Sequence, residues 1–371
     1  MNASRVVFLV HGGPASVEAV RAQGLASRLP GERVAFLYRE GPDSRVARHW
    51  WRELDRLRPA LVYVVNTAMP GALLAPWWSR RHGLPYVLDT GDAIYEMERA
   101  AGMGPRWRLP LLRFTEAFAQ RRAAAIVVRG TRHQEFLQAA GYRRVERIRD
   151  GFVDRGPVPE AAVAALRERW GMSAGFVVGV LGSLAFSPRL RICYGWDLVE
   201  ALAALPDLPV QGLVVGDGNG LPFLQERAAA LGVADRIRFA GRIPYPDVPA
   251  ALRVMDIALS TQTNNLPGQV RTTGKLPEYM AAGRFVLASR VGEAALLLPE
   301  SMLVQFQGTV DRAYPGRLAA RIREVYARPD WRGLAATLPE KARALCSYEV
   351  LSGEFLRLAV SLAPALGVDV P

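Results

Sequence analysis

Cysteine is scarce in this chain of 371 residues. Its two cysteines, Cys193 and Cys346, lie far apart in the sequence, and only four histidines accompany them. Two distant thiols give neither a disulfide framework nor a metal-ligand spacing, and they are typical of a reducing compartment. We therefore expect a cytoplasmic protein without a metal site.

Long apolar runs are also missing. The first residues, MNASRVVFLVHGGP, hold no apolar stretch long enough for a signal peptide. The longest uncharged segment, residues 59–79, has the length of a membrane span, but Pro70, Gly71 and Pro76 interrupt it. These residues predict a buried strand, a turn and the start of a helix instead.

Lysine is almost absent, although the chain is strongly basic. The formal net charge is +12, and the only lysines are Lys275 and Lys341. Residues 1–160 carry 25 arginines and 16 acidic residues, so most of the excess charge, +9, lies in the first half. Such a charge suits nucleic acid, anionic lipid or a phosphorylated substrate. Because the charge forms no dense run and no known nucleic-acid module is visible, we expect no nucleic-acid partner.

Short apolar strands alternate with helical segments along both halves of the chain. The first half has five candidate strands, at residues 5–10, 33–38, 60–65, 85–89 and 124–130. The second half has five more, at residues 176–183, 209–218, 236–241, 256–262 and 284–289. This alternation predicts α/β domains with parallel sheets.

A segment rich in turn-forming residues, DGFVDRGPVPE at 150–160, separates the two halves. It predicts one Rossmann-like domain at residues 1–155 and a second at residues 156–345. Residues 346–371 predict a helix and a tail that could return to the first domain. In parallel α/β sheets, ligands bind beyond the C-terminal ends of the strands, so the loops there are the candidate sites.

Three glycine-containing loops follow predicted strands. They are VHGGP with Gly12 and Gly13, LGSLAFSPR with Gly182, Ser183 and Arg189, and VVGDGNG with Gly216. Glycine permits close backbone approach, and the N-terminus of a following helix favours an anion. None of the loops matches a dinucleotide fingerprint or a P-loop, and a tight strand–helix turn would need the same glycines.

A fourth loop contains one of the two lysines. The stretch RTTGKLPEYMAAG, residues 271–283, predicts a helix that begins near Lys275 and ends at Gly283. A cation near a helix N-terminus is unfavourable unless an anion lies between them. A lysine suits a point contact to phosphate, and Glu278 could accept hydrogen bonds from ribose hydroxyls. The alternative is an exposed lysine followed by an ordinary first-turn acid.

Taken in order, these stretches resemble the retaining GT-B glycosyltransferases of family four, the glycosyl transferases group one. GKLPEYMAAGRFVLASRVG, residues 274–292, resembles the family signature Lys-x-x-Glu-Tyr-x-Ala-x-Gly. Residues 214–261 resemble the family stretch from a glycine-rich turn, through Phe-x-Gly, to the strand before the nucleotide loop. HGGPASVEAVRAQGLASRL, residues 11–29, resembles its glycine loop and following helix. The resemblance covers most of the chain.

The resemblance implies two Rossmann-like domains whose parallel sheets face each other across a cleft. It implies a hexosyltransferase (EC 2.4 class) that moves a sugar from a nucleotide diphosphate sugar to an acceptor and retains the anomeric configuration. The acceptor would be a glycan, a lipid-linked molecule or a small molecule, and no metal or other cofactor is expected. Fixed cations and helix N-termini would stabilise the leaving nucleotide diphosphate.

The resemblance also implies site residues from both domains. The catalytic set would be Asp92, Arg271 and Lys275. The donor-binding set would be Gly12, Gly13, Gly182, Ser183, Arg189, Arg191, Gly216, Arg242, Ile243, Asn265, Gln269, Thr273 and Glu278. Lys275 and Arg271, with Arg189 or Arg191, would neutralise the diphosphate. Glu278 would hold the ribose, and Arg242 and Ile243 would lie near the base.

Three features depart from the family pattern. The first is the family's GR…K motif after the first strand of the second domain, because here Ser183 follows Gly182. Val270 stands eight residues before Glu278, where the family often has a second glutamate. Sugar contacts would then come from elsewhere in the loop, from Asn264, Asn265 or Gln269. Gly91 stands where the family often has the histidine of a His–Asp pair, which leaves Asp92 as the substitute.

Residues 99–122 interleave arginine with large apolar side chains, among them Trp107, Leu111, Phe114 and Phe118. Basic amphipathic stretches can lie on anionic membranes. Such contact would suit a lipid-linked acceptor and a peripheral position at the inner face of the membrane. Helices that pack inward and leave their arginines in solvent are the alternative.

Three other functions compete with sugar transfer. A nucleotide-sugar 2-epimerase on the same fold would need acidic and histidine residues around the sugar, and of the four histidines only His11 follows a predicted strand. The departures at Val270 and Gly91 allow a non-catalytic GT-B relative. A nucleic-acid-binding protein is suggested by the net charge alone.

Overall fold

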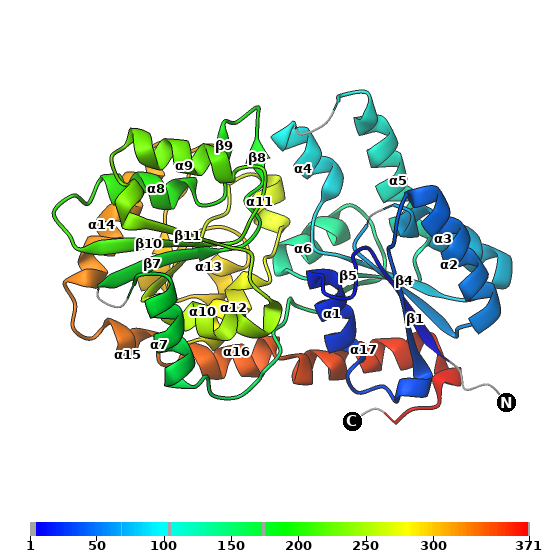
Figure 1. Cartoon of the computed structure of the whole chain (residues 1–371). Coiled ribbons are helices and arrows are strands. Elements are labelled where there is room, and N and C mark those ends of the chain that lie inside the picture. Colours follow the sequence, from blue (N-terminus) through cyan, green and yellow to red (C-terminus); the bar gives the residue numbers. More distant parts are fainter. Residues whose placement is uncertain (1–4, 68, 103–104, 173–174, 370–371) are drawn as a thin grey trace.

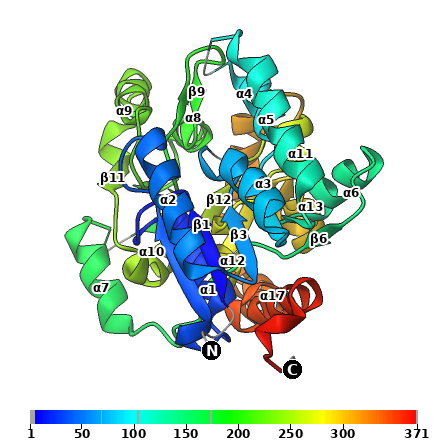
Figure 2. The ribbon, with the colours of Figure 1, turned by 90° about the vertical axis from the view of Figure 1, so that its right-hand side faces the viewer.

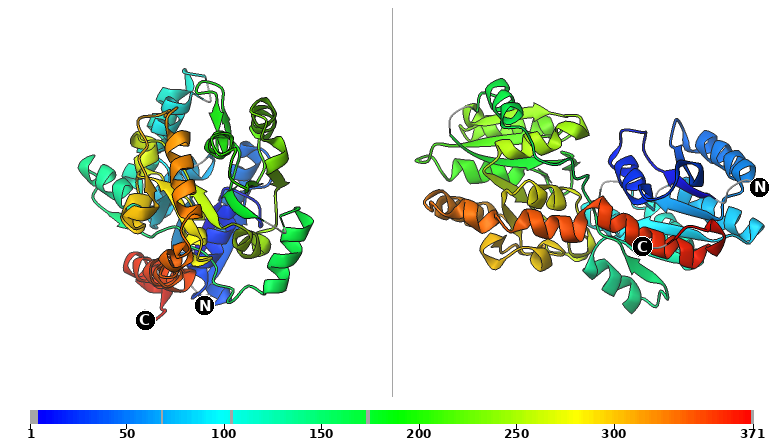
Figure 3. Two further views of the ribbon diagram at one scale, coloured as in Figure 1. Left: turned by 90° about the vertical axis from the view of Figure 1, so that its left-hand side faces the viewer. Right: turned by 90° about the horizontal axis from the view of Figure 1, so that it is seen from below.

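The computed structural model describes residues 5–67, 69–102, 105–172 and 175–369 (Figure 1). It has two α/β domains, each built on a six-stranded parallel sheet. Helices cover both faces of each sheet, and the two domains lie side by side with the final helices passing along both (Figure 3). This architecture confirms the predicted fold class, two Rossmann-like domains.

The first sheet has the strand order β2-β1-β3-β4-β5-β6. Its strands are β1 (Val6–Val10), β2 (Val34–Tyr38), β3 (Leu61–Val65), β4 (Tyr86–Thr90), β5 (Ala125–Val128) and β6 (Val145–Arg147). All residues of β1, β3, β4 and β5 are buried, which explains their continuous apolar runs, because both faces of a parallel sheet are covered. The five predicted strands are confirmed, whereas the short strand β6 was not predicted.

Six helices connect these strands. They are α1 (Val17–Ala26), α2 (Asp43–Leu57), α3 (Gly71–His82), α4 (Ile94–Ala101), α5 (Arg108–Arg122) and α6 (Thr131–Ala139). Strand β3, a turn and helix α3 occupy the uncharged segment 59–79, as predicted. No helix among the described residues has the length and apolar character needed to cross a membrane.

The second sheet has the order β11-β10-β7-β12-β13-β14. Its strands are β7 (Phe176–Leu181), β10 (Val210–Val215), β11 (Ile237–Gly241), β12 (Ile257–Ser260), β13 (Phe285–Ser289) and β14 (Leu303–Val304). The five predicted strands are again confirmed. An antiparallel hairpin of β8 (Phe186–Ser187) and β9 (Ile192–Cys193) follows β7 and was not predicted.

Eleven helices are described from residue 160 onward. They are α7 (Glu160–Arg169), α8 (Trp196–Ala203), α9 (Leu221–Ala230), α10 (Val248–Val254), α11 (Leu266–Val270), α12 (Lys275–Ala281), α13 (Ala294–Leu297), α14 (Tyr314–Tyr326), α15 (Trp331–Ala335), α16 (Leu338–Cys346) and α17 (Tyr348–Leu362). The predicted helix at Lys275 is α12, and Gly283 follows its end with a φ of 64°. That left-handed conformation is one that glycine adopts without strain.

The chain passes between the domains twice. Residues 148–159 lead from β6 to α7, and α17 returns to the first domain. The two passages meet, because Phe152 N donates to Cys346 O (3.0 Å) and Tyr348 N donates to Phe152 O (3.1 Å). The domain limits at residues 155 and 345 stay predictions.

Helix α17 is part of the core of the first domain (Figure 2). It packs along α1, and its side chains Leu351 and Phe355 are buried against the sheet. Gly24 of α1 allows this contact, since a Cβ there would lie 2.3 Å from the ring of Tyr348. The return of the last helix to the first domain, which the sequence left open, is therefore a feature of the fold.

Candidate active site

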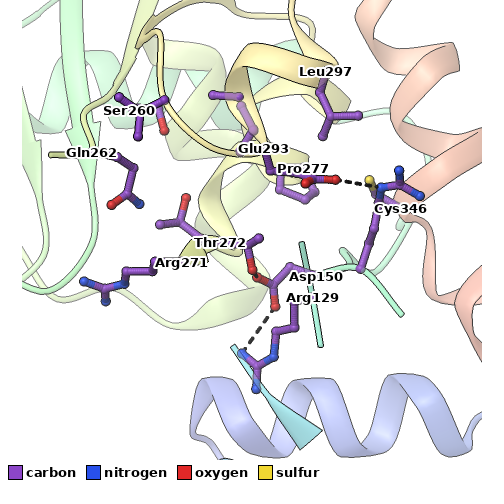
Figure 4. Close-up of a pocket in the computed structure, with 15 residues that line it drawn as sticks. Arg129, Asp150, Ser260, Gln262, Arg271, Thr272, Pro277, Glu293, Leu297 and Cys346 are labelled. Carbon is purple, nitrogen blue, oxygen red and sulfur yellow. Dashed lines mark hydrogen bonds and ion pairs between the residues drawn. The ribbon is translucent and has the colours of Figure 1, made fainter. Parts of the chain in front are cut away.

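A pocket between the two domains is lined by residues that follow strand ends in both sheets (Figure 4). Arg129 follows β5 of the first domain, and Ser260 ends β12 of the second. Arg271, Thr272 and Thr273, in the loop before α12, line it as well, whereas Lys275 and Glu278 of the predicted site are not among its lining residues. This is where ligands of parallel α/β sheets bind.

The loops after β7 and β10 touch through their glycines. Gly182 and Gly216 have φ angles of 149° and 143°, which only glycine adopts readily. A Cβ on Gly216 would lie 1.9 Å from the carbonyl oxygen of Gly182. The two predicted donor loops are therefore brought together, and any side chain at position 216 would separate them.

Gly182 and Gly216 form a surface without side chains, which we call the glycine floor. Lys275 extends across it. It is the first residue of α12, and a Cβ on Gly182 would lie 2.6 Å from its Nζ. The ammonium also lies 3.5 Å from the centroid of the Tyr194 ring, a cation–π contact. Tyr194 is fixed by its hydroxyl, which donates to Leu259 O (2.8 Å). No local sequence pattern pointed to this tyrosine.

Among the residues that the structure describes, no carboxylate forms an ion pair with the Lys275 ammonium. Burial lowers its pKa from 10.5 to about 7, and the charge of Arg271 lowers it further, while Asp197 opposes the shift. An anion at this position would restore the full charge of the lysine. The pKa of Lys275 is therefore sensitive to any charge in the site, and that of Arg271 already acts on it.

Glu278 lies on α12 and is buried. Its Oε1 accepts a hydrogen bond from the hydroxyl of Tyr245 (2.5 Å), and burial raises its pKa to about 7. Tyr245 comes three residues after Arg242, which is exposed, and Ile243 between them is half-buried against the core. The predicted ribose-binding acid and the loop predicted to lie near the base are therefore neighbours.

Three polar contacts join the domains around the pocket. Arg271 Nε lies 3.1 Å from Asp92 Oδ1, and Thr272 Oγ1 donates to Asp150 Oδ2 (2.6 Å). The third is made by Glu293, which accepts hydrogen bonds from both Thr131 N (2.8 Å) and Arg149 Nε (3.3 Å). The acids Asp150 and Glu293 are buried, whereas the side chains of Arg271 and Asp92 are partly exposed.

A buried ionic cluster supports the first-domain side of the pocket. Asp89 accepts from Arg21 Nε (2.5 Å), Tyr63 Oη (2.9 Å) and Arg129 Nε (3.2 Å). Burial alone would raise the pKa of Asp89, but the two arginines outweigh it and the pKa is lowered. Arg129 also contacts Asp150 (3.4 Å), so the cluster extends to the interdomain contact with Thr272. The sequence prediction missed these residues, although a charge inside the apolar strand YVLDT was a usable signal.

Several residues of the predicted donor set lie elsewhere or are already bonded. Asn265 Oδ1 accepts from Gly268 N (3.0 Å), and the side chain of Gln269 bonds Asn264 (2.8 Å) and Gly292 N (3.0 Å). Arg189 donates to Arg99 O (3.2 Å), and Arg191 is exposed with a φ of 54°. Neither arginine lines the pocket.

In the first domain, the glycine loop after β1 stands beside the start of α1. A Cβ on Gly12 would lie 2.3 Å from Ser16 Oγ, whereas one on Gly13 would meet nothing within 4 Å. His11 in the same loop lies 3.0 Å from Arg39 Nη1. His49, His82 and His133 lie on α2, α3 and α6. The residues described here contain no group of three or more His, Cys, Asp or Glu arranged to hold a metal ion.

The face of α5 carries exposed aromatic and basic side chains. Trp107 is 74% exposed and Phe114 62% exposed, and Leu111 and Trp77 of α3 are exposed beside them. Arg122 lies over the ring of Phe118 at 4.1 Å. Around these side chains, the arginines at positions 106, 108, 113, 121 and 122 are exposed. We call this surface the α5 face.

Two Rossmann-like domains around a cleft, with a lysine on a glycine floor at the strand ends of the second, define a GT-B glycosyltransferase. Residues 175–327 match the family model described as glycosyl transferases group 1. The chain is 30% identical over 316 residues to a 2-deoxystreptamine glucosyltransferase of Streptomyces kanamyceticus, covering 82% of this chain and 76% of that protein. The chain thus belongs to the glycosyl transferases group 1 family and is a glycosyltransferase.

Two further similarities are informative. Over 161 residues, 42% of this chain and 39% of the other, it is 35% identical to a GDP-mannose-dependent α-(1-6)-phosphatidylinositol monomannoside mannosyltransferase of Mycolicibacterium smegmatis. The structure of Anabaena Alr3699/HepE in complex with UDP and glucose superposes with a TM-score of 0.78 at 18% identity, covering 97% of this chain and all of the other. The second similarity shows the fold alone.

Proposed function

We propose that the protein transfers a hexose from a nucleotide diphosphate sugar to an acceptor hydroxyl, with retention of anomeric configuration and without a metal. The observation that carries this proposal is Lys275, a half-buried cation on the Gly182 floor with a pKa lowered to about 7. A bound anion stabilises the charged form of such a lysine. A nucleotide diphosphate sugar carries this anion into a glycosyltransferase.

In this proposal the diphosphate lies over Gly182 and Gly216, between Lys275 and Arg271. Glu278 accepts hydrogen bonds from the ribose hydroxyls. The hydrogen bond from the Tyr245 hydroxyl to Glu278 Oε1 is then either broken or kept beside the new ones. The bond between the anomeric carbon and the phosphate oxygen breaks, and the acceptor oxygen bonds to the same face of that carbon. The acceptor proton passes to the departing phosphate. The two cations stabilise the charge that develops on the leaving group, the role that a metal would otherwise have.

The acceptor class has two candidates. The similarity to an enzyme named for 2-deoxystreptamine suggests a small polyhydroxylated cyclic acceptor with amino groups. The α5 face suggests a lipid-linked acceptor at an anionic membrane, as does the similarity to an enzyme named for phosphatidylinositol monomannoside. Exposed aromatic side chains among arginines are the composition of interfacial membrane-binding surfaces. A cytoplasmic protein in peripheral contact with the inner membrane face would fit this second class.

A thermal-shift screen tests the donor proposal. UDP-, GDP-, ADP-, CMP- and dTDP-sugars are compared, and one group is expected to raise the unfolding temperature, because a ligand that binds only the folded state stabilises it. Lys275→Ala is expected to fold and to lose this response. If no nucleotide stabilises the wild type, the proposal is wrong.

Vesicle sedimentation separates the two acceptor classes. If the acceptor is lipid-linked, the protein should sediment with phosphatidylcholine–phosphatidylglycerol vesicles at low salt, and Trp107→Ser/Phe114→Ser should not. Leu296→Ser is the matched control, since Leu296 is an exposed apolar side chain of the second domain. Equal sedimentation of all three proteins, or none by the wild type, would leave the small polar acceptor as the proposal.

A further inference from the structure

Arg271 has a partner in the other domain that a donor could replace. It lies in the loop between α11 and α12, and its Nε contacts Asp92 Oδ1, after β4, at 3.1 Å. The side chains are 48% and 33% exposed, although the contacting Asp92 Oδ1 atom is itself buried. Ion pairs this open to solvent are weak and are readily exchanged for another ligand. The other interdomain acids, Asp150 and Glu293, are nearly buried and are not open to such exchange.

The position of Arg271 favours an exchange with diphosphate. Arg271 lies four residues before Lys275, in the loop that leads into α12, and its charge contributes to the lowered pKa of that lysine. A single carboxylate carries one negative charge, whereas a nucleotide diphosphate brings more than one and can contact both cations. Guanidinium–phosphate hydrogen bonds are among the strong charge-assisted ones. The donor would therefore compete effectively with Asp92 for Arg271.

The Asp92 carboxylate can accept a hydrogen bond from another group once its ion pair with Arg271 is broken. Its Oδ1 is buried and, among the described residues, makes no hydrogen bond; its contact there is the ion pair with Arg271. A carboxylate oxygen that loses its cation in such a place needs a hydrogen-bond donor. A hydroxyl group entering the cleft can supply that donor.

We propose that Asp92 pairs with Arg271 in the empty enzyme, that the diphosphate of the donor displaces it, and that the freed carboxylate then accepts a hydrogen bond from an acceptor hydroxyl other than the one that reacts. Asp92 is thus a positioning residue for the donor arginine before it becomes a ligand for the acceptor. Donor binds first and acceptor second, because the acceptor contact exists only after the exchange. This inference rests on the proposed function, since it requires a diphosphate ligand.

Nucleotide affinity tests the exchange, because a competing carboxylate lowers affinity. The probe is whichever of UDP, GDP or ADP stabilises the wild type most, and its Kd is measured by calorimetry. Asp92→Asn keeps the side-chain size and removes the charge, so it should tighten Kd about three- to tenfold. Arg271→Gln should weaken Kd. In the Arg271→Gln background, Asp92→Asn should have no further effect on Kd, because the arginine for which Asp92 and the diphosphate compete is gone.

Two comparisons keep the outcome clear. Asp154→Asn removes a carboxylate from an ion pair of the same length, with Arg343 Nε at 3.1 Å, and should leave Kd unchanged. Asp92→Glu retains the charge and should bind like the wild type. An unchanged or weaker Kd for Asp92→Asn overturns the inference. So does a tightening that persists without Arg271, which would show a general charge effect. If the wild type binds no nucleotide diphosphate, the proposed function itself has failed.

Discussion

The guanidinium of Arg129 lies in the space toward which a side chain at position 91 would point. A Cβ on Gly91 would be 2.9 Å from both Cδ and Nη1 of Arg129. The family often has a histidine at this position, and here that space is filled by an arginine from the neighbouring strand. A side chain at position 91 and the observed position of Arg129 therefore exclude each other.

Gly91→Ala is expected to displace Arg129 and to lower the free energy of unfolding. The displaced guanidinium would lose contacts with Asp89 and with Asn66 Oδ1 (2.6 Å), so we expect a loss of about 1–3 kcal/mol. Urea unfolding measures it. Gly13→Ala is the control, because its Cβ would meet no atom within 4 Å. Equal stability of the two variants would refute this packing argument.

The affinity for a nucleotide diphosphate should fall as the pH rises above about 7. Lys275 has a lowered pKa of about 7 in the empty protein, and a bound anion would raise it, so binding takes up a proton. The Kd should weaken by up to about tenfold per pH unit between pH 7 and the higher pKa of the complex. Calorimetry across pH 6–9 measures this slope.

Lys275→Arg is the matched variant for that slope, since arginine stays charged throughout this range. The Glu278 carboxyl, whose pKa is raised to about 7, titrates nearby but is present in both proteins. A slope that is the same in the arginine variant would contradict the assignment to Lys275.

Glu278→Gln should stabilise the empty protein above pH 7. Burial raises the pKa of Glu278 from 4.5 to about 7, so the native state binds the proton more tightly than the unfolded state. The contribution of this group to stability therefore falls as the pH rises from about 4.5 to about 7, by about 2–4 kcal/mol. The glutamine variant should lack that loss and should bind nucleotide more weakly. Thermal unfolding at pH 5 and pH 8 shows whether the pH dependence disappears.

Phe355→Ala should destabilise the first domain, although residue 355 follows the second domain in the sequence. The phenylalanine is buried and lies 5.4 Å from Phe8 and 5.3 Å from Tyr63, between ring centroids. We expect a loss of about 3–5 kcal/mol, with faster hydrogen exchange in α1 and β1. Val350→Ala on the exposed side of the same helix should change stability little. Faster exchange confined to the second domain would contradict this assignment.

Strands and helices with long buried runs could be predicted from the sequence, because burial on both faces leaves continuous apolar segments. The short strands β6 and β14 could not, since three residues and two residues leave no periodic signal. In the site, Lys275 and Gly182 were both predicted to contact the donor, and the structure brings the two together. The roles of these residues in binding stay predictions.

The contacts that sequence reasoning missed join residues far apart in the chain. Tyr194 meets Lys275 across 81 positions, and Glu293 meets Thr131 across 162. The first pair depends on packing within the second domain and the second pair on how the two domains are placed, and local sequence predicts neither. The side chains of Asn265 and Gln269 were predicted to bind sugar because amides suit that role. In the structure they instead make hydrogen bonds with Gly268, Asn264 and Gly292.

The return of α17 to the first domain sets the order in which this protein can mature on the ribosome. The strands β1 to β6 are synthesised first, but the sheet face that Leu351, Phe355 and Leu366 cover stays bare until the last residues emerge. Domains usually fold as units in order of synthesis. Here the second domain can complete its core first. Until α17 is synthesised, part of the apolar surface of the first domain stays exposed and accessible to chaperones.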